Sequence, residues 1–588
     1  MTDCIPRIAD LVGFAPGEGG ASLARGIALA DEPGIGAQTI PGYLAELVAR
    51  HGPAEAVVLN AGGARIAWSY DDLGARAAEV ARALIATGHG KGERVGLLMT
   101  NRPEFLSGLF GIALAGGVAV ALSTFSTPGE LAYLLEASAV STLLFEARVA
   151  KTDFAAMLVD LEPAIATARA GALRSLRFPF LTRLVALDAV APGGVAGAPH
   201  RVDTGGAIEG WEAFVGHGRD VAQALVEARR ATVVPGDPGG IFFSSGTTGN
   251  PKGIVHEQRS FAIQWWRWPR VFAMREPVRA WTGNGFFWSG NVSMVVGSAL
   301  STGGTVVLQR FFEPDEALRL IAGERVSFAN GRPHQWARLR SAAGWAAADL
   351  SSLRHATYNE LLRDHPGFSS DWHLPMSFGT TETMSICTSL SADYPPEAYQ
   401  GSFGVPLPGN TLKIVDPETR AILPVGAIGE TCIKGPTLMS GYLGKTSEQC
   451  FDAEGFYATG DGGSLDAQGR YFWAGRLTDM IKTGGANVAP EEIDRLVANW
   501  PGVKRCQTVG VADALLGEKV VTCIVPVDGH AIDTAALGEF LKSRLASFKQ
   551  PRRILVCSEA DFALTGNEKI KSAAIRALAE RRLAGAAD

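Results

Sequence analysis

The stretch from Phe105 to Gly129 carries no charged side chain, and it restricts the fold more than any other part of the 588-residue chain. It reads FLSGLFGIALAGGVAVALSTFSTPG and is long enough to span a bilayer. Gly116 and Gly117, however, divide it into a segment of helix length and a short VAVAL run. This pattern is typical of a buried helix followed by an interior strand of a parallel sheet. We therefore expect a parallel sheet with a buried core, and a membrane span is the less favoured alternative.

Helical and short apolar segments alternate on both sides of this stretch. Between about residues 40 and 235, YDDLGARAAEVARALIATG has helical periodicity, whereas RVGLLMT and VSTLLFE have the pattern of strands. The alternation continues to about residue 400, as in a parallel α/β fold. From Gly401 to about Arg476 the pattern changes to short strands with many turns, such as LKIVD, GETCIKG and RYFWAG. This part predicts a small antiparallel barrel or sheet.

The end of the chain has the pattern of a compact α+β unit. Strands are predicted at CQTVGVAD and KVVTCIVPV, and helices around EEIDRLVANW and LGEFLKSRL. A chain of this length is too long for one core. The predicted fold class is thus α/β, with a large N-terminal domain over residues 1–475 that includes a β-barrel-like subdomain over 401–475. A small mobile C-terminal domain is predicted over 476–588.

Composition excludes several classes of function. The chain is 47% hydrophobic and 19% charged, as expected for a globular protein. Its net charge is -6 and it has no run of lysine and arginine, so nucleic acid is not an expected partner. The 7 cysteines include no C-x-x-C pair, which predicts reduced thiols and no zinc site. The N-terminus, MTDCIPRIADLVGF, lacks the features of a secretory signal. These features favour a cytoplasmic location.

Residues 244–253 read SSGTTGNPKG, which suggests a loop that binds polyphosphate. Glycines let backbone N–H groups approach an anion, hydroxyls add donors, and lysine adds a positive charge. The loop is not a Walker A motif, because Asn250 and Pro251 separate Gly249 from Lys252. On its own, a solvated turn of small polar residues is the more common explanation of such a loop.

Further motifs follow the loop in a fixed order. They are SFGTTET (377–383), GSFGVPLPGN (401–410), GETCIKGPTLMSGY (429–442), YATGD (457–461), GRLTDMIKTGGANVAPEEID (475–494) and LTGNEKIK (564–571). Together with the loop they resemble the adenylate-forming superfamily of acyl-CoA synthetases, nonribosomal-peptide adenylation domains and luciferases, over about residues 40–576. The resemblance implies an ATP-dependent acid–thiol ligase. A carboxylate attacks the α-phosphate of ATP to give acyl-AMP and pyrophosphate, and a thiol then displaces AMP.

The same resemblance implies which residues bind ATP and AMP. They are Ser244, Ser245, Gly246, Thr247, Thr248, Gly249, Lys252, Phe378, Gly379, Thr380, Thr381, Asp461 and Arg476. The loop and Lys252 are expected to hold the β- and γ-phosphates. Phe378 is expected to stack on adenine, where relatives usually have tyrosine, and Thr381 to donate to the α-phosphate.

Three further acidic and basic positions follow from the resemblance. Glu382 is expected to hold magnesium, a cation that prefers carboxylate and phosphate oxygens; a plain helix-start acid is the alternative. Asp461 is expected to accept the ribose hydroxyls beside Arg476, unless the two form a surface ion pair. The predicted catalytic residues are Lys569, Thr248 and Glu382.

The C-terminal motifs match the family less closely. Lys569 of TGNEKIK is expected to neutralise charge between the attacking carboxylate and the α-phosphate. Glu568 replaces the usual glycine, and Lys571 is the alternative register. Thr478 stands at the predicted hinge, where aspartate or lysine is usual. Gly484 and Gly485 are expected to border the CoA pantetheine tunnel, with a simple turn as the alternative.

The acyl pocket is expected beside GNGFFWSGNVSM, with Phe287, Trp288 and Arg332 as its residues. Trp288 replaces a frequent histidine, and a bulky aromatic favours an apolar acid. Arg332 stands where a small apolar residue usually precedes the proline, and it is expected to meet a polar group of the acid or to form a salt bridge. HATYNELL also replaces the usual Gly-Gly-Ala-Pro. Trp265 and Trp266 are interpreted as core residues, with a place in the pocket wall as the alternative.

These observations predict an acyl-CoA synthetase that uses ATP, magnesium and CoA to activate a hydrophobic acid, whether fatty, aromatic or ring-bearing. An acyl-AMP ligase that loads a carrier protein is the alternative with the same fold. A catalytically inactive scaffold is the alternative of another class. The expected partners are small molecules, no transmembrane segment is expected, and the oligomeric state, a homodimer included, stays open.

Overall fold

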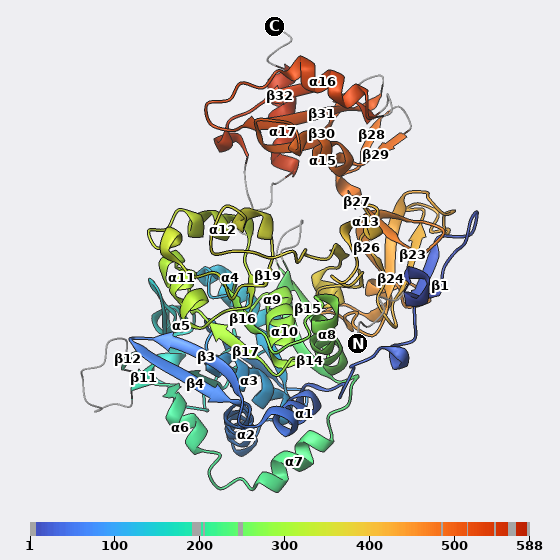
Figure 1. Cartoon of the computed structure of the whole chain (residues 1–588). Coiled ribbons are helices and arrows are strands. Elements are labelled where there is room, and N and C mark those ends of the chain that lie inside the picture. Colours follow the sequence, from blue (N-terminus) through green and yellow to red (C-terminus); the bar gives the residue numbers. More distant parts are fainter. Residues whose placement is uncertain are drawn as a thin grey trace.

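The computed structural model describes residues 7–190, 202–203, 206–244, 251–483, 486–513, 516–545, 549–562 and 572–584. Two large sheets form the centre of the N-terminal part (Figure 1). An antiparallel sheet lies beside them, and a small α+β unit lies above it in the view of Figure 1. The fold class predicted from the sequence is confirmed.

The first sheet has the strand order β13-β10-β7-β5-β6-β14-β15-β25. Its strands are β5 (Arg94–Leu98), β6 (Val118–Ala121), β7 (Thr142–Phe145), β10 (Arg183–Ala186), β13 (Ile208–Gly210), β14 (Pro238–Ser244), β15 (Lys252–Glu257) and β25 (Gly441–Tyr442). The strands from β13 to β14 run parallel, whereas β15 and β25 are antiparallel to their neighbours. One edge of a parallel sheet thus ends in a hairpin.

The second sheet has the order β19-β18-β16-β17-β3-β4. Its strands are β3 (Glu55–Ala61), β4 (Ala64–Ser69), β16 (Arg279–Thr282), β17 (Thr305–Leu308), β18 (Phe328–Asn330) and β19 (His355–Ala356). All pairs are parallel except the hairpin of β3 and β4. Chain segments from both halves of the N-terminal part therefore build this sheet.

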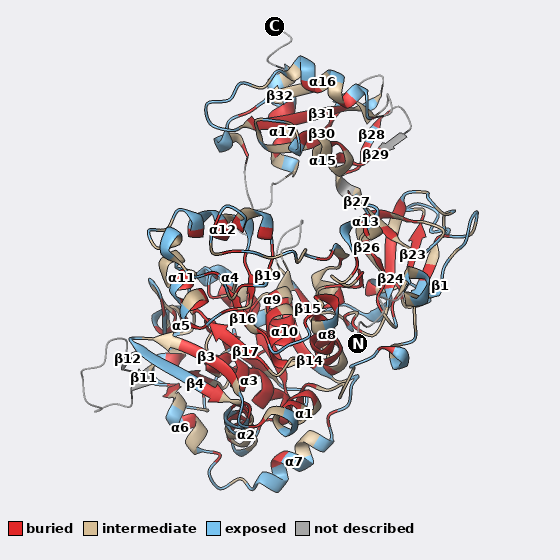
Figure 2. Cartoon of the chain, viewed as in Figure 1, coloured by how far each residue is buried: buried red, intermediate tan, exposed pale blue. Residues whose placement is uncertain are grey.

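The two sheets share a helical layer between them. Neighbouring strand residues point to opposite faces, and accordingly Leu97 and Leu98 of β5 belong to different cores. The shared core contains residues of α1 (Ile40–His51), α2 (Tyr70–Ala86), α3 (Pro103–Leu114) and α8 (Gln258–Val271). The outer faces are covered by α4 (Pro128–Ser138) and α5 (Phe154–Leu161) on the first sheet, and by α11 (Pro314–Gly323) and α12 (Pro333–Arg340) on the second. Figure 2 shows the buried strands at the centre of these layers.

The uncharged stretch forms a buried helix and strand, as predicted. Every residue of α3 except Glu104 is buried, and β6 pairs in parallel with β5 and β14. α3 packs closely on α2, because a Cβ at Gly111 would lie only 2.7 Å from the Ala77 carbonyl oxygen. Within the described part of the chain, no helix is both long and apolar enough to cross a membrane.

The antiparallel sheet has the order β1-β2-β23-β24-β26-β27. Its strands are β1 (Val12–Phe14), β2 (Leu23–Gly26), β23 (Thr411–Val415), β24 (Gly429–Lys434), β26 (Tyr457–Leu465) and β27 (Tyr471–Arg476). The four later strands lie where the sequence predicts short antiparallel strands. β1 and β2 come from the N-terminus, and the sequence analysis assigns no strand there.

The C-terminal unit is a sheet with helices. Its strands are β28 (Ile481–Thr483), β29 (Ala486–Val488), β30 (Val503–Asp513), β31 (Gly517–Pro526) and β32 (Arg553–Val556). Its helices are α15 (Pro490–Ala498), α16 (Thr534–Lys542) and α17 (Ser572–Ala584). The long strands β30 and β31 and the helices α15 and α16 correspond to the predicted elements.

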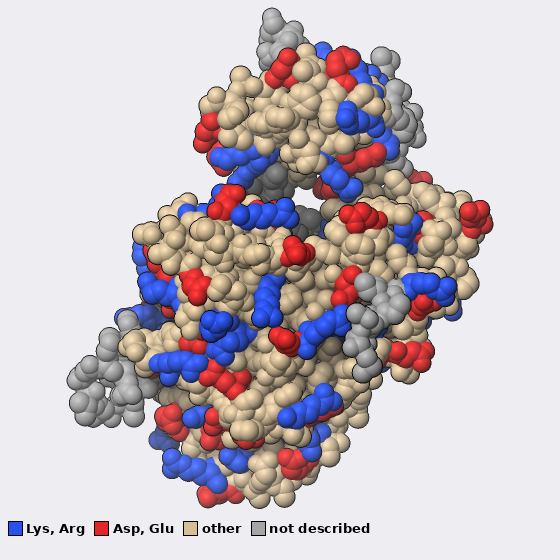
Figure 3. All heavy atoms as spheres, in the orientation of Figure 1, with Lys and Arg blue, Asp and Glu red and all other residues tan. Residues whose placement is uncertain are grey.

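Charges are distributed evenly over the visible surface. On the face shown in Figure 3, lysine and arginine side chains are mixed with aspartate and glutamate side chains. This face has no extended basic stripe of the kind that follows a nucleic-acid backbone.

Candidate active site

The loop rich in serine, threonine and glycine connects the two strands of a hairpin. β14 ends at Ser244, β15 begins at Lys252, and these two residues are register partners. Because β14 runs parallel to β6, this end of the hairpin lies at the carboxyl ends of the parallel strands, where open α/β sheets bind ligands. The predicted loop residues that lie outside the described residues are Ser245, Gly246, Thr247, Thr248 and Gly249. The structure thus places both ends of the predicted phosphate loop.

Residues 379–386 form a tight segment after β20 (Ser377–Phe378). The backbone at Gly379 runs so close to Ser385 that a Cβ at Gly379 would lie 1.9 Å from the Ser385 carbonyl oxygen. Thr380 precedes a single 3-10 turn, η7 (Thr381–Thr383), which carries Glu382. Oγ1 of Thr380 is buried and has no hydrogen-bond partner among the described residues. A buried hydroxyl without a partner costs free energy, which fits a segment that a polar ligand completes.

Tyr442 of β25 connects Glu382 with the hairpin. Its hydroxyl donates a hydrogen bond to Oε1 of Glu382 over 2.7 Å and lies 2.8 Å from the hydroxyl of Tyr457. The ammonium of Lys252 lies 5.4 Å from the centre of the Tyr442 ring, within the range of a cation–π contact. Burial, followed by the charge of Glu382, raises the pKa of Tyr442 far above its usual value. The hydroxyl therefore stays protonated and able to donate.

Glu382 has the surroundings that a magnesium ligand needs. Its side chain is half-buried, and apart from the bond from Tyr442 no hydrogen bond to its carboxylate is found among the described residues. Across the described ranges, no three histidine, cysteine, aspartate or glutamate side chains gather as a metal group. Magnesium does not require such a group, because one carboxylate and the phosphates of a nucleotide suffice to hold it. The residues present therefore fit this cation.

Asp461 and Arg476 are partners across the antiparallel pair of β26 and β27. The Nε atom of Arg476 lies 3.2 Å from Oδ1 of Asp461, and Nε1 of Trp473 donates to the same oxygen over 3.2 Å. Asp461 is only 2% exposed. Asp461 is thus buried in the sheet, whereas the Arg476 side chain is 52% exposed, and the role of the pair stays a prediction. A buried, oriented carboxylate is suited to accept hydroxyl groups of a ligand.

Phe378, the predicted adenine-stacking residue, packs against the core of the antiparallel sheet. It is buried, and its ring centre lies 4.9 Å from that of Tyr471. The backbone of Phe378 pairs with Thr388 in a short antiparallel sheet. One face of the ring is thus occupied by protein, and stacking on adenine stays a prediction.

The predicted acyl-pocket residues follow adjacent parallel strands of the second sheet. Phe287 and Trp288 come after β16, and Arg332 comes after β18. Trp288 is partly buried and its ring centre lies 5.3 Å from that of Phe287. Arg332 is exposed, and its guanidinium makes no hydrogen bond or ion pair with any residue that the structure describes. Both loops therefore start at the same end of the sheet.

Buried asparagine side chains hold these loops. Asn101 donates to the Asn284 carbonyl over 2.8 Å, and it accepts from the Phe286 amide over 2.9 Å. Asn330 donates to Asn291 over 3.1 Å. These bonds connect the first sheet, through Asn101 after β5, with the loop that carries Phe287 and Trp288. The position of the aromatic residues is thus fixed by both sheets.

Trp265 and Trp266 of α8 lie in the core between the sheets. Nε1 of Trp265 donates to the Val292 carbonyl over 3.2 Å, and Nε1 of Trp266 donates to the Ala37 carbonyl over 3.1 Å. Both tryptophans are buried with satisfied donors, in agreement with their interpretation as core residues.

Comparison with known proteins identifies the family. The profile of the AMP-binding enzyme family matches residues 44–443, which is more than half of the chain. The chain belongs to the AMP-binding enzyme family. The profile of the AMP-binding enzyme C-terminal domain matches residues 492–569. The prediction of an AMP-forming ligase in the adenylate-forming superfamily is confirmed at this level, and with it the binding of ATP.

Individual AMP-binding enzymes resemble the chain over most of their length. The acyl-CoA synthetase YngI of Bacillus subtilis, named as putative, is 26% identical over 87% of this chain and 92% of its own. Feruloyl-CoA synthase of Amycolatopsis is 29% identical over 87% of this chain and 94% of its own. The solved structure of the anthranilate CoA ligase AuaEII with anthranoyl-AMP has a TM-score of 0.70 at 22% identity, covering 94% of this chain and 99% of its own. This last likeness confirms the fold.

In this AMP-binding enzyme the predicted hinge lies directly after β27. Thr478 belongs to the short turn η8 (Leu477–Asp479). The carboxylate of Glu491 from α15 packs against Gly475, where a Cβ would lie 1.9 Å from Oε2 of Glu491. Oγ of Ser572 donates to Asp479 over 3.2 Å. The C-terminal unit therefore contacts the last strand of the antiparallel sheet through Glu491, whereas the Ser572 bond lies within that unit.

Three predicted residues of the C-terminal unit lie outside the described residues. They are Gly484, Gly485 and Lys569. The alternative lysine, Lys571, and Glu568 lie outside them as well. Their assigned roles stay predictions.

The sequence analysis missed two residues at the site. Tyr442 stands in the quoted motif that ends in SGY, but the motif gives it no role. Phe125 is 79% exposed, and its ring meets that of Phe287 edge-on at 5.7 Å between centres. Its exposure at the same end of the sheets marks this aromatic side chain only once the structure is known. Phe125, Phe287 and Trp288 form an aromatic row, in which the buried Phe287 lies between the exposed Phe125 and the partly buried Trp288.

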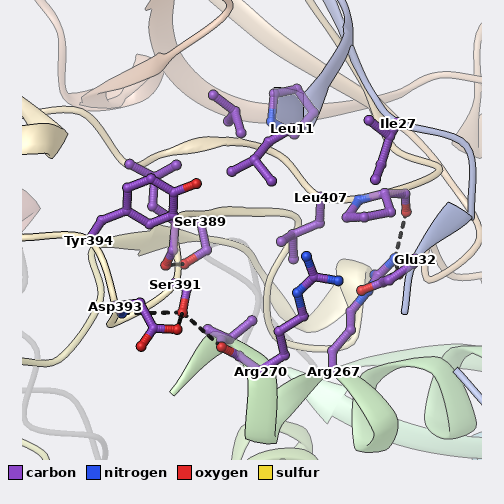
Figure 4. A pocket seen from close by; sticks show the side chains of 15 residues that line it. Leu11, Ile27, Glu32, Arg267, Arg270, Ser389, Ser391, Asp393, Tyr394 and Leu407 are labelled. Carbon is purple, nitrogen blue, oxygen red and sulfur yellow. Dashed lines mark hydrogen bonds and ion pairs between the residues drawn. The ribbon is translucent and has the colours of Figure 1, made fainter. Parts of the chain in front are cut away.

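A separate pocket of this enzyme contains none of the predicted site residues (Figure 4). Leu11, Ile27 and Leu407 line it together with Arg270 and Tyr394. At its edge, Arg267 donates to both carboxylate oxygens of Glu32, at 2.9 Å and 2.8 Å. This buried ion pair connects α8 with the N-terminal segment. Arg267 and Glu32 therefore have a structural role.

Proposed function

We propose that this AMP-binding enzyme is an acyl-CoA synthetase that activates an apolar carboxylic acid. The observation that carries the proposal is the meeting of Lys252, Tyr442 and Glu382, which come from three distant motifs. A cation at the end of the phosphate loop and an acid that fits magnesium thereby contact one tyrosine, Lys252 over its ring and Glu382 at its hydroxyl. A binding protein without catalysis has no need of this arrangement.

In the first half-reaction, a carboxylate oxygen of the acid attacks the α-phosphorus of ATP, and the bond to pyrophosphate breaks. Ser244, Lys252 and the loop between them are proposed to hold the β- and γ-phosphates and to stabilise the leaving pyrophosphate. Thr381 is proposed to donate to the α-phosphate. When bound at Glu382, magnesium would neutralise phosphate charge.

The nucleoside and the acid are held by other elements. Asp461, fixed by Trp473 and Arg476, is proposed to accept the ribose hydroxyls. Lys569 is proposed to sit between the carboxylate and the α-phosphate during attack, where its charge opposes the developing negative charge. The role of Asp461 rests on the family resemblance and on the geometry of its pair, and the role of Lys569 rests on the resemblance alone.

In the second half-reaction the thiol sulfur of CoA attacks the acyl carbon, and AMP leaves with the oxygen that joined it to the acid. We propose that the C-terminal domain, over 476–588, turns about Thr478 between the two steps. Gly484 and Gly485 are proposed to border the pantetheine. The N-terminal domain is proposed to end at residue 475, with 401–475 as its β-barrel-like subdomain.

The aromatic row supports an apolar acid as substrate. Phe287 and Trp288 present large nonpolar surfaces, and pockets for apolar ligands are lined in this way. The likeness to a feruloyl-CoA synthase is consistent with a ring-bearing acid. The exposed Arg332 at the neighbouring loop is proposed to meet a polar group on the distal part of the acid.

The proposal is tested by a screen of acids with ATP, magnesium and CoA. Fatty acids of several lengths, cinnamic acids and arylacetic acids form the panel, and AMP and acyl thioester are measured separately. We expect AMP and thioester in equal amounts with at least one apolar acid. Acyl-AMP without thioester would support a carrier-protein ligase instead. No AMP with any acid of the panel would contradict the proposed activity.

A further inference from the structure

We propose that Gln264 and His256 are positioning residues that hold residues 380–386 in the conformation that ATP binding requires. The inference rests on the proposed function, because it gives these two buried side chains a role at the same site. Neither residue stands in a motif that resembles the family's ATP-binding motifs. Both come from the elements that follow the phosphate hairpin, His256 from β15 and Gln264 from α8.

Gln264 contacts three carbonyl groups of the segment at once. Its Nε2 atom lies 2.7 Å from the Ile386 oxygen, 2.9 Å from the Met384 oxygen and 3.2 Å from the Thr383 oxygen. The side chain is fully buried. Two N–H groups are thus shared among three acceptors in a fully buried place, where hydrogen bonds are strong electrostatically.

His256 binds the same segment nearer its start, at the Thr381 carbonyl. Its Nε2 lies 2.8 Å from the Thr381 carbonyl oxygen, which is an acceptor, so Nε2 carries the proton and donates. The ring is fully buried and stands nearly perpendicular to that of Phe261, at 6.3 Å between centres. Packing therefore fixes the direction of this donor.

The backbone conformation explains why the segment needs such support. Met384 has φ 51° and Ser385 has φ 97°, both in the region that favours glycine. Non-glycine residues held there are strained and persist only where their surroundings fix them. The Gln264 amide binds the carbonyl groups on either side of Ser385, which is the place of greatest strain.

The held carbonyls flank the residues that are proposed to meet ATP. Thr381 and Glu382 lie between Thr380, whose hydroxyl has no partner among the described residues, and the carbonyls bound by Gln264. The carbonyl of Glu382 itself accepts from the Met439 amide over 2.7 Å. With its backbone fixed on this side, the Glu382 side chain reaches Tyr442.

Substitutions that remove the donors but keep the volume test this inference. Q264M removes the amide, and H256F removes the ring donor. H256Q retains a donor that reaches to nearly the position of Nε2 and serves as the conservative variant. Q309M is the matched control, because Gln309 is also a buried glutamine that donates to a backbone carbonyl, that of Glu313 over 2.9 Å, and it stands outside the segment.

The main readout is the affinity for magnesium-bound α,β-methylene ATP, measured by titration calorimetry on the full chain. We expect Q264M and H256F to bind about five- to tenfold more weakly, the scale of one or two hydrogen bonds, with H256Q and Q309M within about twofold of the unaltered protein. In pyrophosphate exchange, the KM for ATP should rise in Q264M while the KM for the acid stays the same.

A purely structural role gives a different result. Folded Q264M and H256F proteins that bind the ATP analogue as tightly as Q309M would overturn the inference. If Q264M does not fold, the comparison of H256F with H256Q decides alone, and equal affinities of these two variants would overturn it. Failure of the proposed function is separate, since it would show as absent exchange in the unaltered protein with every acid.

Discussion

Tyr442 donates its hydroxyl hydrogen bond to Oε1 of Glu382 over 2.7 Å, and these residues are 60 positions apart in the chain. The bond orients a carboxylate that is otherwise bound by no described side chain. It also places that carboxylate near Lys252, which lies over the same tyrosine ring. The substitutions E382Q and Y442F therefore test separately how the charge of this carboxylate and its orientation contribute to the reaction.

E382Q should retain the fold yet lose pyrophosphate release by about two orders of magnitude or more, the scale of a lost electrostatic contact. Y442F should lose only about five- to tenfold, because it removes one hydrogen bond and leaves the charge. Pyrophosphate release at saturating acid measures both. Near-normal turnover of folded E382Q would remove Glu382 from the site.

The aromatic row should set the size of the acid. W288A deletes an aromatic side chain of a type that buries roughly 150–250 Å², and it should shift preference toward longer or bulkier acids. F125A should raise the KM for apolar acids by about tenfold without changing the KM for ATP. Phe125 is expected to act by covering the bound acid.

The matched control for F125A is F180A, since Phe180 is also exposed, at 59%, and belongs to no part of the site. The ratio of kcat/KM across a series of chain lengths is the measurement. Unchanged ratios in W288A would place Trp288 in the core, and equal acid KM values for F125A and F180A would exclude Phe125 from the pocket.

Lys569 should serve only the first half-reaction. K569A is expected to lose acyl-AMP formation while still converting supplied acyl-AMP and CoA to thioester, because the lysine acts during attack on phosphorus. T478P should do the reverse, since proline restricts the backbone at the predicted hinge. Separate assays of the two half-reactions measure both effects.

Equal loss of both half-reactions in folded K569A and T478P proteins would argue against the two-position account. K571A is then the informative variant, because it tests the other register of the C-terminal motif. A selective loss of adenylation in K571A, with K569A active, would move the role to Lys571.

Asp494 of α15 should make stability depend on pH. Burial raises its pKa from 3.8 to about 7, and its Oδ1 atom has no partner among the described residues. Between these values the unfolded chain has released the proton while the folded chain still holds it. Stability from this group is therefore complete below about pH 4 and is lost as the pH rises to about 7.

D494N removes this dependence. The thermal midpoint of the variant should fall less steeply over this pH window, and at about pH 8 it should lie roughly 3–8 °C above that of the unaltered protein. Calorimetric scans across the window measure it. Identical pH profiles for the two proteins would show that Asp494 ionises normally in the folded state.

Much of the fold follows from local sequence patterns. The uncharged stretch predicted α3 and β6, because elements that are buried on all sides consist of apolar residues. Gly116, with a φ of 79°, lies at the break between the two elements. β1 and β2 were not predicted, because these short strands carry little periodicity and gain their place only by pairing with β23. Long-range pairing of that kind leaves no local signal.

Site residues were predictable from the sequence only where they stand in a motif of the family with an assigned role. Asp461 and Arg476 were expected together, and the sheet pairs them directly. Gln264 and His256 were not expected at the site. Each binds a carbonyl more than 100 residues away in the chain, and such a contact produces no local sequence pattern. Tyr442 was missed for the same reason, since its partner Glu382 lies in another motif.

The central claim is that the acid attacks the α-phosphorus of ATP before CoA reacts. A single turnover with an acid labelled with 18O in its carboxylate tests it most directly, with AMP and the thioester analysed by mass spectrometry. The account predicts one 18O atom in AMP for each thioester formed, because thiol attack leaves the bridging oxygen with AMP. Thioester formed with unlabelled AMP, or with ADP and labelled phosphate, would contradict it.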